Sequence, residues 1–293
     1  MHTRDDLIHF KPGKKFFVGL DSDGCVFDSM EPKHKECFCP VTIEKFGLAP
    51  ISKYAREAWE FVNLYSQDRG CNRFFALQKT FDLLRRRSAV NRRNFRVPEL
   101  RDLDAWTRRE TRLGNPALRT EIERTQSGEL KRILDWSLAI NASVERVVVG
   151  VPPFPLVREC LARLQPAADI VVVSGTPAEA LEREWEEHGI RNFAALIAGQ
   201  EIGSKKEHLQ FTTSGKVEPG FGLMVGDAPG DLKAATANGL RFFPVNPGHE
   251  EASWERFHGE IIGLFLSGGY TQEIEDGLVR EFQSCLPEKP VWE

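Results

Sequence analysis

Two aspartates close an apolar run near the N-terminus of the chain. The run Phe16–Leu20 is followed by Asp21, Asp23 and Gly24, in the stretch FFVGLDSDGCVFDSM. Two carboxylates this close oppose each other's ionisation. The arrangement therefore indicates either a compensating cation or a chemical use for the two carboxylates.

Three further stretches, VVVSGTP, GSKKEHL and MVGDAPGD, carry groups of a related kind. They hold, in chain order, Ser174, Lys205, Lys206, Asp227 and Asp231. Several carboxylates, with no His or Cys among the candidate residues named, favour a hard cation, above all Mg²⁺. A hydroxyl, an ammonium group and the N–H groups at helix starts favour a phosphate.

These residues lie where strands are expected to end and helices to begin. After about residue 151, helical patterns alternate with short apolar runs, which are DIVVVSG, AALIAG, FGLMVGD and RFFPV. Such alternation predicts an α/β fold, a Rossmann-like parallel sheet covered by helices on both faces. Ligands bind beyond the carboxyl ends of the strands in sheets of this kind, so we expect the four stretches to meet in one crevice.

The segment between the first strand and about residue 150 has a helical texture. Its apolar residues recur at three- and four-residue spacing, as in RFFALQKTFDLLRRR. The strand Phe16–Leu20 needs a sheet to join, and the later strands can supply it. We therefore expect residues 31–150 to form an α-helical domain inserted into an α/β core made of residues 1–30 and 151–293. The alternative is an N-terminal helical domain with a stray strand.

The composition narrows the class of protein. With 293 residues, 41% of them hydrophobic, the chain can form two modest domains with packed cores. The net charge of −4 argues against a general nucleic-acid binder, and no apolar run approaches the roughly 20 residues of a membrane span. The N-terminus lacks the layout of a secretion signal, and the six cysteines form no CxxC pair. We expect a cytoplasmic protein that binds neither nucleic acid nor a membrane; the sequence does not indicate an oligomeric state.

The stretches DSDGCVFDS, VVVSGT, the lysine near 205 and GDAPGD, in that order, resemble the four motifs of the haloacid dehalogenase (HAD) superfamily. The resemblance covers residues 16–29 and 151 to about 265. The helical segment resembles, in position only, the cap that many members insert between motifs one and two. Each motif alone is a weak signal, whereas four in order, each behind a strand or at a helix start, are a specific one.

The resemblance implies a Mg²⁺-dependent phosphatase that acts on a small phosphorylated metabolite. Asp21 would be the nucleophile, giving an aspartyl-phosphate, and Asp23 would protonate the leaving oxygen and then activate water. Asp227 would hold the metal together with Asp21, and Asp231 would either bind the metal or orient the groups that bind it. In the family the residue that matches Asp23 binds the metal through its backbone carbonyl, which leaves its carboxyl group free for proton transfer.

The same resemblance assigns the groups that would hold the substrate. Ser174 and Lys205 would bind the phosphoryl oxygens, and Gly24 and Gly175 would permit a close approach of the backbone. Lys206 stays an alternative to Lys205 as the motif lysine, although the Gly-Ser-Lys spacing favours Lys205.

One position departs from the pattern of the family. Members usually carry Thr or Val where this chain has Cys25. A thiol is similar in size, so we expect little loss beyond a hydroxyl hydrogen bond. Asp28 and Ser29 are expected to organise the exit from this loop and to take no part in the chemistry.

Several alternatives stay open. A sugar-phosphate mutase would share every motif. A phosphonate hydrolase would use a lysine of the helical domain as a Schiff base, and the candidates are Lys33, Lys35, Lys45 and Lys53. A non-enzymatic binding protein on a HAD core would be expected to have lost some of the aspartates that this chain keeps. The arginine-rich stretch 85–119 predicts a solvated, ion-paired surface, although one of its arginines could hold a second anionic group of the substrate.

Overall fold

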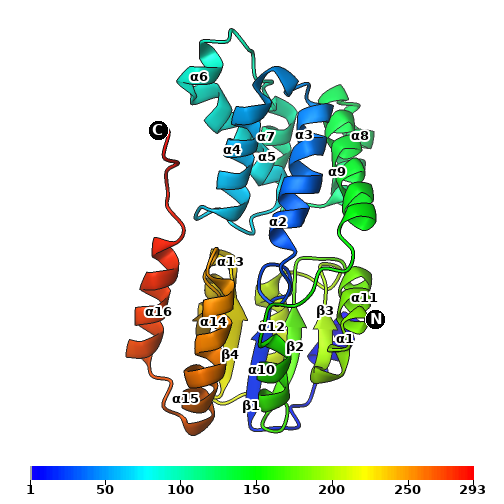
Figure 1. Cartoon of the computed structure of the whole chain (residues 1–293). Helices are drawn as coiled ribbons and strands as arrows, with labels where there is room; N and C mark the ends of the chain where they lie inside the picture. Colours follow the sequence, from blue (N-terminus) through cyan, green and yellow to red (C-terminus); the bar gives the residue numbers. More distant parts are fainter. Residues whose placement is uncertain (1) are drawn as a thin grey trace. The chain divides into compact units, whose positions relative to one another are not determined.

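The structure, a computed structural model, describes residues 2–293 (Figure 1). The chain divides into two compact units. The first is formed by the chain up to Met30 together with Gly150–Leu286, and the second by Glu31–Val149 together with Pro287–Glu293.

The first unit is an α/β unit. Its strands are β1 (Phe16–Leu20), β2 (Ala168–Val173), β3 (Ala194–Ala198), β4 (Gly222–Gly226) and β5 (Arg241–Pro244). Its helices are α1 (Arg4–Ile8), α10 (Val157–Leu164), α11 (Ala178–Glu187), α12 (Lys205–Thr213), α13 (Pro229–Ala237), α14 (Glu250–Arg256), α15 (Ile262–Ser267) and α16 (Gln272–Ser284), with a 3₁₀ turn at Arg191–Phe193 and a π-helical turn at Phe257–Ile261.

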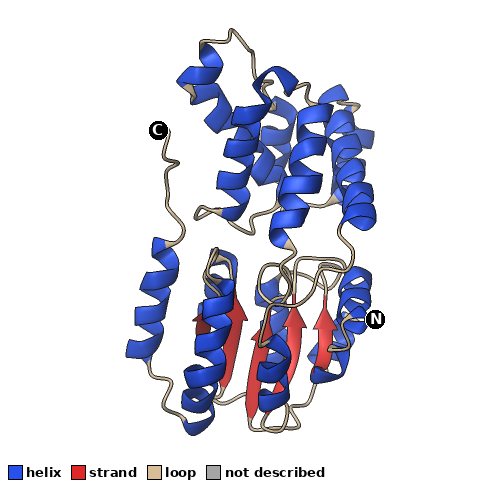
Figure 2. Cartoon of the chain, in the orientation of Figure 1, coloured by secondary structure: helices blue, strands red, loops and turns tan. Residues whose placement is uncertain are grey.

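The five strands form one sheet in the order β3-β2-β1-β4-β5. All paired neighbours are parallel, and the strand arrows run in the same direction in Figure 2. The strand at Phe16–Leu20 is therefore the central one, paired with two strands that follow it by about 150 and 200 residues. This confirms the predicted α/β fold with a parallel sheet, and it shows why the first strand cannot fold as part of a separate N-terminal domain.

Helices cover both faces of the sheet. Along β1, Phe16, Val18 and Leu20 pack on one face against residues of α10, α11, α14 and α15. Phe17 points to the opposite face and packs in a second cluster with residues of α1, α12, α13 and α16. Every residue of β1 is buried. The strand therefore has no alternation of apolar and polar residues, as expected for a strand covered on both faces.

The second unit is helical. It contains α2 (Met30–Pro32, which begins in the first unit), α3 (Cys39–Lys45), α4 (Ser52–Leu64), α5 (Arg73–Arg86), α6 (Ser88–Asn91), α7 (Arg101–Thr107), α8 (Asn115–Thr125) and α9 (Gly128–Val147), with a π-helical turn at Lys33–Phe38 and a 3₁₀ turn at Ala49–Ile51. Its own hydrophobic core is built around Trp59, Trp106 and Trp136, all fully buried.

The last seven residues correct the prediction that residues 151–293 all belong to the α/β core. Pro287–Glu293 belongs to the helical unit. The Trp292 ring packs edge-on against Phe61, with 5.8 Å between the ring centroids, and the Arg87 guanidinium lies 4.3 Å from the centroid of the indole. The aromatic pair and the cation–π contact hold the Trp292 ring in this position. A segment of seven residues carries no sequence pattern from which this packing could be predicted.

Among residues 2–293, no helix combines the length and the apolar character that crossing a membrane requires.

Candidate active site

The strand order brings three of the predicted site loops together. β1 lies between β2 and β4, and all three run in the same direction. Ser174, Asp21 and Asp227 directly follow the carboxyl ends of these three strands. Adjacent parallel strands thus place the three side chains at one edge of the sheet, where α/β proteins bind their ligands.

The loop after β1 is a compact turn. The Ser22 carbonyl accepts hydrogen bonds from the N–H groups of Val26 (2.8 Å) and Phe27 (3.0 Å). Gly24 has a φ of 76°, a left-handed conformation that an L side chain rarely adopts. The predicted need for glycine at this position therefore has a backbone cause.

Two buried tryptophans hold this loop from outside its own sequence. Trp185 Nε1 donates to Ser22 Oγ (3.0 Å), and Trp254 Nε1 donates to the Cys25 carbonyl (2.8 Å). The Cys25 side chain itself is fully buried in the core, and burial raises the pKa of its thiol, so it packs as a small apolar group. Sequence reasoning missed both tryptophans, because nothing local links them to the loop.

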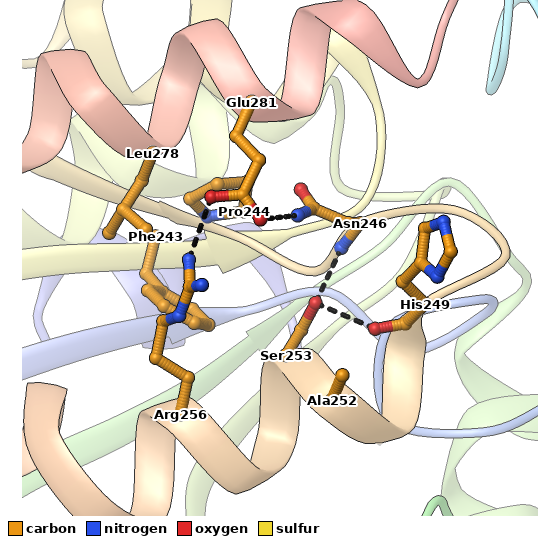
Figure 3. Close-up of a pocket in the computed structure, with 9 residues that line it drawn as sticks. All are labelled: Phe243, Pro244, Asn246, His249, Ala252, Ser253, Arg256, Leu278 and Glu281. Atoms are coloured by element: carbon orange, nitrogen blue, oxygen red, sulfur yellow. Dashed lines mark hydrogen bonds and ion pairs between the residues drawn. The ribbon is translucent and has the colours of Figure 1, made fainter.

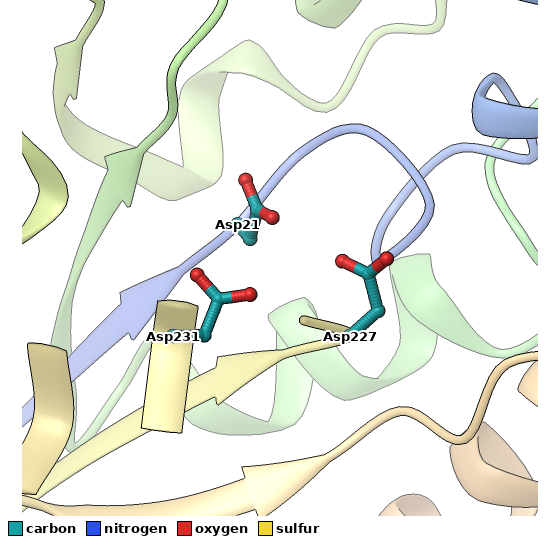
Figure 4. Close-up of side chains that lie close together, drawn as sticks. All are labelled: Asp21, Asp227 and Asp231. Carbon is teal, nitrogen blue, oxygen red and sulfur yellow. The ribbon is translucent and has the colours of Figure 1, made fainter. Parts of the chain in front are cut away.

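Three buried aspartates form the centre of the site. One carboxylate oxygen from each of Asp21, Asp227 and Asp231 lies within 4.8 Å of the others, and the side chains converge (Figure 4). Gly226 makes this approach possible, because a Cβ atom there would lie 2.5 Å from Cβ and Cγ of Asp231. Asp231 is also held by the Ala228 N–H, which donates to its Oδ2 (3.0 Å).

Lys205 places its ammonium group among these carboxylates. Its Nζ lies 2.6 Å from Asp21 Oδ2 and 2.6 Å from Asp231 Oδ1. Lys205 is the first residue of α12, whose N-terminus is capped by the Ser204 side chain. The structure thus brings Lys205 to the site, whereas Lys206, the alternative, is exposed.

The electrostatics of the cluster follow from its burial. Burial raises the pKa of Asp21 from 3.8 to about 6, against the opposing effect of Lys205, and the Asp227 charge adds to the rise. Burial raises the pKa of Asp231 to about 6 in the same way. For Lys205, burial opposes the charge, but Asp21, Asp231 and Asp227 outweigh it and raise its pKa above the ordinary value. The site thus concentrates negative charge that one ammonium group compensates only in part.

The Asp23 carboxylate lies outside this cluster and is held by two hydroxyl groups. Ser29 Oγ donates to its Oδ1 (2.6 Å), and Thr176 Oγ1 donates to its Oδ2 (2.5 Å). Ser29 thus organises the loop, as expected. Thr176 was missed, although it lies two residues after Ser174 in the SGT stretch, and only that proximity could have signalled it.

The loop after β2 presents the predicted phosphate-binding hydroxyl. Ser174 is buried, its N–H donates to the Ala198 carbonyl (3.0 Å), and its Oγ accepts from the Thr176 N–H (3.2 Å). Gly175 is exposed, and a Cβ atom there would meet nothing within 4 Å. The structure therefore gives no steric reason within the protein for a glycine at position 175.

A cavity of about 250 Å³ lies elsewhere in the α/β unit, between β5, α14 and α16 (Figure 3). Phe243 and Leu278 line it with apolar groups, and none of the predicted site residues borders it. Its charged rim is paired internally, since Arg256 contacts Glu281 at 2.8 Å and Asn246 donates to the same carboxylate (3.3 Å). Asn246 Oδ1 is buried in the lining without a hydrogen-bond partner among residues 2–293, but no cluster of charged groups accompanies it.

The residues at the cluster fit a hard divalent cation. Buried carboxylates that converge within 4.8 Å are the oxygen donors that Mg²⁺ prefers, and the raised pKa values of Asp21 and Asp231 mark charge that a cation would relieve. Three of the four predicted metal residues contribute side chains to this cluster. The Asp23 side chain is not part of the cluster, so a metal contact through the Asp23 carbonyl stays a prediction.

No protein-family model matches the sequence, and no curated protein matches it. Solved structures with a similar arrangement include a HAD-superfamily hydrolase of subfamily IA from Geobacter sulfurreducens, with 16% identity, a TM-score of 0.41, and coverage of 79% of this chain and 88% of that one. A predicted phosphoglycolate phosphatase from Haemophilus somnus gives 16% identity, a TM-score of 0.48, and coverage of 79% and 86%.

A HAD hydrolase from Bacillus subtilis, solved with magnesium bound, gives 11% identity, a TM-score of 0.42, and coverage of 78% of this chain and 86% of that one. Two of these three structures are named for the superfamily that the four motifs resemble. At such low identities the likeness concerns the fold and assigns no activity to this chain.

Proposed function

We propose that this protein is a Mg²⁺-dependent phosphatase of the HAD type, which hydrolyses a small phosphorylated metabolite through an aspartyl-phosphate. The observation that supports the proposal is the convergence of Asp21, Asp227, Asp231 and Lys205 at the carboxyl ends of parallel strands. A non-enzymatic binding protein on the same core would be expected to have lost some of these aspartates.

In the first step, an Asp21 oxygen attacks phosphorus and the bond from phosphorus to the leaving oxygen breaks. Asp23, two residues further on, enters this step in its protonated form, gives its proton to that oxygen and thereby becomes a carboxylate. In the second step, Asp23 takes a proton from water, and the resulting hydroxide attacks the phosphorus of the aspartyl-phosphate. Inorganic phosphate leaves, and both aspartates return to their starting states.

The remaining residues of the site would bind the metal ion and the phosphoryl group. Asp21, Asp227 and Asp231 would hold Mg²⁺, which when bound supplies positive charge to the anionic phosphoryl group. The Lys205 ammonium and the Ser174 hydroxyl would bind phosphoryl oxygens. Lys205 contacts Asp21 at 2.6 Å, so the group that would receive the phosphoryl already lies beside a cation.

The test is hydrolysis of p-nitrophenyl phosphate with Mg²⁺, with EDTA, and by Asp21→Asn. We expect activity that needs Mg²⁺ and falls at least about 10³-fold in the variant, because the nucleophile is gone. Asp28→Asn is the matched control, since Asp28 is exposed in the same loop, and it should stay within about threefold of wild type. Equal turnover by Asp21→Asn and wild type would overturn the proposal. Product analysis separates release of inorganic phosphate from transfer within a sugar phosphate.

The phosphonate-hydrolase alternative gains little from Lys35 and Lys45, two of its four candidate lysines. A Schiff base needs a neutral amine, yet Lys35 pairs with Glu31 and Lys45 pairs with Asp135, at 2.6 Å and 2.7 Å. Burial opposes the charge on Lys35, but its bonds to Glu31 and Tyr65 outweigh it and raise its pKa, and the bond to Asp135 raises that of Lys45. Both amines are thus held as cations.

A cytoplasmic location stays a prediction.

A further inference from the structure

The Asp23 carboxylate is held from two sides by loops that are far apart in the sequence. Ser29 belongs to the same loop as Asp23, whereas Thr176 lies 153 residues away, in the loop after β2. Rotation about the last bond of an aspartate is soft, so a carboxylate held at one oxygen can still turn. A donor on each oxygen fixes its plane.

The backbone of Thr176 is itself held. Its N–H donates to Ser174 Oγ (3.2 Å), and its carbonyl accepts from the Gln200 N–H (3.1 Å), in the loop after β3. The two loops pack closely, because a Cβ atom on Gly199 would lie only 2.4 Å from the Ala178 nitrogen. Thr176 is also β-branched, which restricts its χ1 angle. Its hydroxyl is therefore aimed at Asp23 by the loops after two neighbouring strands.

We propose that Thr176 is a positioning residue that sets the orientation of the Asp23 carboxylate and ties it to the Ser174 loop. The inference rests on the proposed function, in which Asp23 transfers the protons. Proton transfer requires the carboxylate within hydrogen-bond reach of the leaving oxygen and of water, and small misplacements are costly in rate. Thr176 does not touch the reacting atoms; it acts through Asp23.

Thr176→Val removes the hydroxyl and keeps the shape, and Thr176→Ser keeps the hydroxyl. On p-nitrophenyl phosphate we expect Thr176→Val to lower kcat about 10- to 100-fold with KM within about threefold, and Thr176→Ser to retain at least about a third of kcat. A role in packing alone would give the opposite order, because Thr176→Val keeps the side-chain volume whereas Thr176→Ser loses the methyl group. Wild-type kcat in Thr176→Val would overturn the inference.

A second test asks whether the loss of kcat in Thr176→Val arises through Asp23. In an Asp23→Asn background, Thr176→Val should lower kcat at most about twofold, because the carboxylate that Thr176 positions is already gone. A full, additive loss in that background would show that Thr176 acts elsewhere and would overturn the inference.

A third readout does not need activity, so it separates this inference from the proposed function. Crystal structures of Thr176→Val and Thr176→Ser should show the Asp23 carboxylate rotated or in two orientations in the first and unchanged in the second. If wild type hydrolyses no phosphate ester, the proposed function fails while this readout still decides whether Thr176 positions Asp23. An unchanged orientation of the Asp23 carboxylate in Thr176→Val would refute the inference that Thr176 positions Asp23.

Discussion

At the scale of single residues, Lys205 and Lys206 offer a matched pair of neighbours with different surroundings. Lys205 contacts two buried carboxylates, whereas Lys206 is exposed. We expect Lys205→Met to lower kcat/KM for an aryl phosphate by about 10²- to 10³-fold, since an ammonium group that would stabilise the phosphoryl charge is removed. Lys206→Met should stay within about threefold, and initial rates at low substrate concentration measure both. Equal losses in the two variants would contradict the assignment of Lys205.

The burial of Asp231 also predicts how stability depends on pH in metal-free protein. Its pKa is raised from 3.8 to about 6 in the folded state, mainly by burial. Between these values the folded state binds more protons than the unfolded state, so the contribution of Asp231 to the free energy of unfolding falls as pH rises from about 4 to about 6.

Asp231→Asn removes that dependence. Urea unfolding in EDTA should show the stability of the variant rising relative to wild type by about 2 kcal/mol between pH 4 and pH 7. Saturating Mg²⁺ should favour wild type at pH 7, because the cation stabilises the carboxylate form. Parallel curves for the two proteins in EDTA would contradict the raised pKa of Asp231.

The residues that could be predicted from the sequence are those whose neighbours in the chain reveal their place. Asp21, Ser174 and Asp227 each follow an apolar run that reads as a strand, so their position at the sheet edge follows from local pattern. Trp185 and Trp254 could not be predicted, because their partners lie 163 and 229 residues away. Their hydrogen bonds exist only once the sheet has formed.

At the scale of elements, the junction between β4 and α13 depends on Gly226. An alanine there would bring its Cβ to 2.5 Å from the Asp231 side chain, so that side chain must move. We expect Gly226→Ala to weaken the apparent affinity for Mg²⁺ by about 10- to 100-fold, measured by titrating activity with the metal.

Gly230→Ala is the control for that experiment. Gly230 lies in the first turn of α13, and a Cβ there would meet nothing within 4 Å. Mg²⁺ affinity should therefore be unchanged in Gly230→Ala. Because alanine favours a helix more than glycine does, the stability of the variant should be equal or slightly higher. A wild-type metal titration for Gly226→Ala would contradict the close approach of Asp231.

The elements themselves were predictable to different degrees. All five strands were expected, because strands buried on both faces are short, apolar runs bounded by polar residues. The helical pattern of EEASWERFHGEIIGLFL is interrupted by the π-helical turn at Phe257–Ile261, which separates α14 from α15. A π turn changes the number of residues per turn without changing residue type, so the apolar pattern does not mark it.

At the scale of the whole molecule, the C-terminal segment is the feature that departs from the predicted division of the chain. Trp292 contacts Phe61 and Arg87 in the helical unit, and Arg87 also pairs with Glu57. We expect Trp292→Ala to destabilise the helical unit by about 1–2 kcal/mol, the sum of an aromatic pair and a cation–π contact.

Hydrogen exchange would locate this effect. Amides of α4 and α5 should exchange faster in Trp292→Ala, whereas those of β1 and β2 should not change. Val291→Ala is the control, since the Val291 side chain is 99% exposed, and its stability should stay within about 0.5 kcal/mol of wild type. Uniform acceleration across both units would mean that the segment does not belong to the helical unit alone.

The docking of Pro287–Glu293 has a consequence for synthesis on the ribosome. The central strand is translated first but must wait for partners about 150 and 200 residues later, and the helical unit between them must wait for the last seven residues of the chain. A nascent chain that stops before β2 therefore exposes an unpaired central strand, and one that stops before Pro287 leaves the aromatic site of the helical unit unfilled.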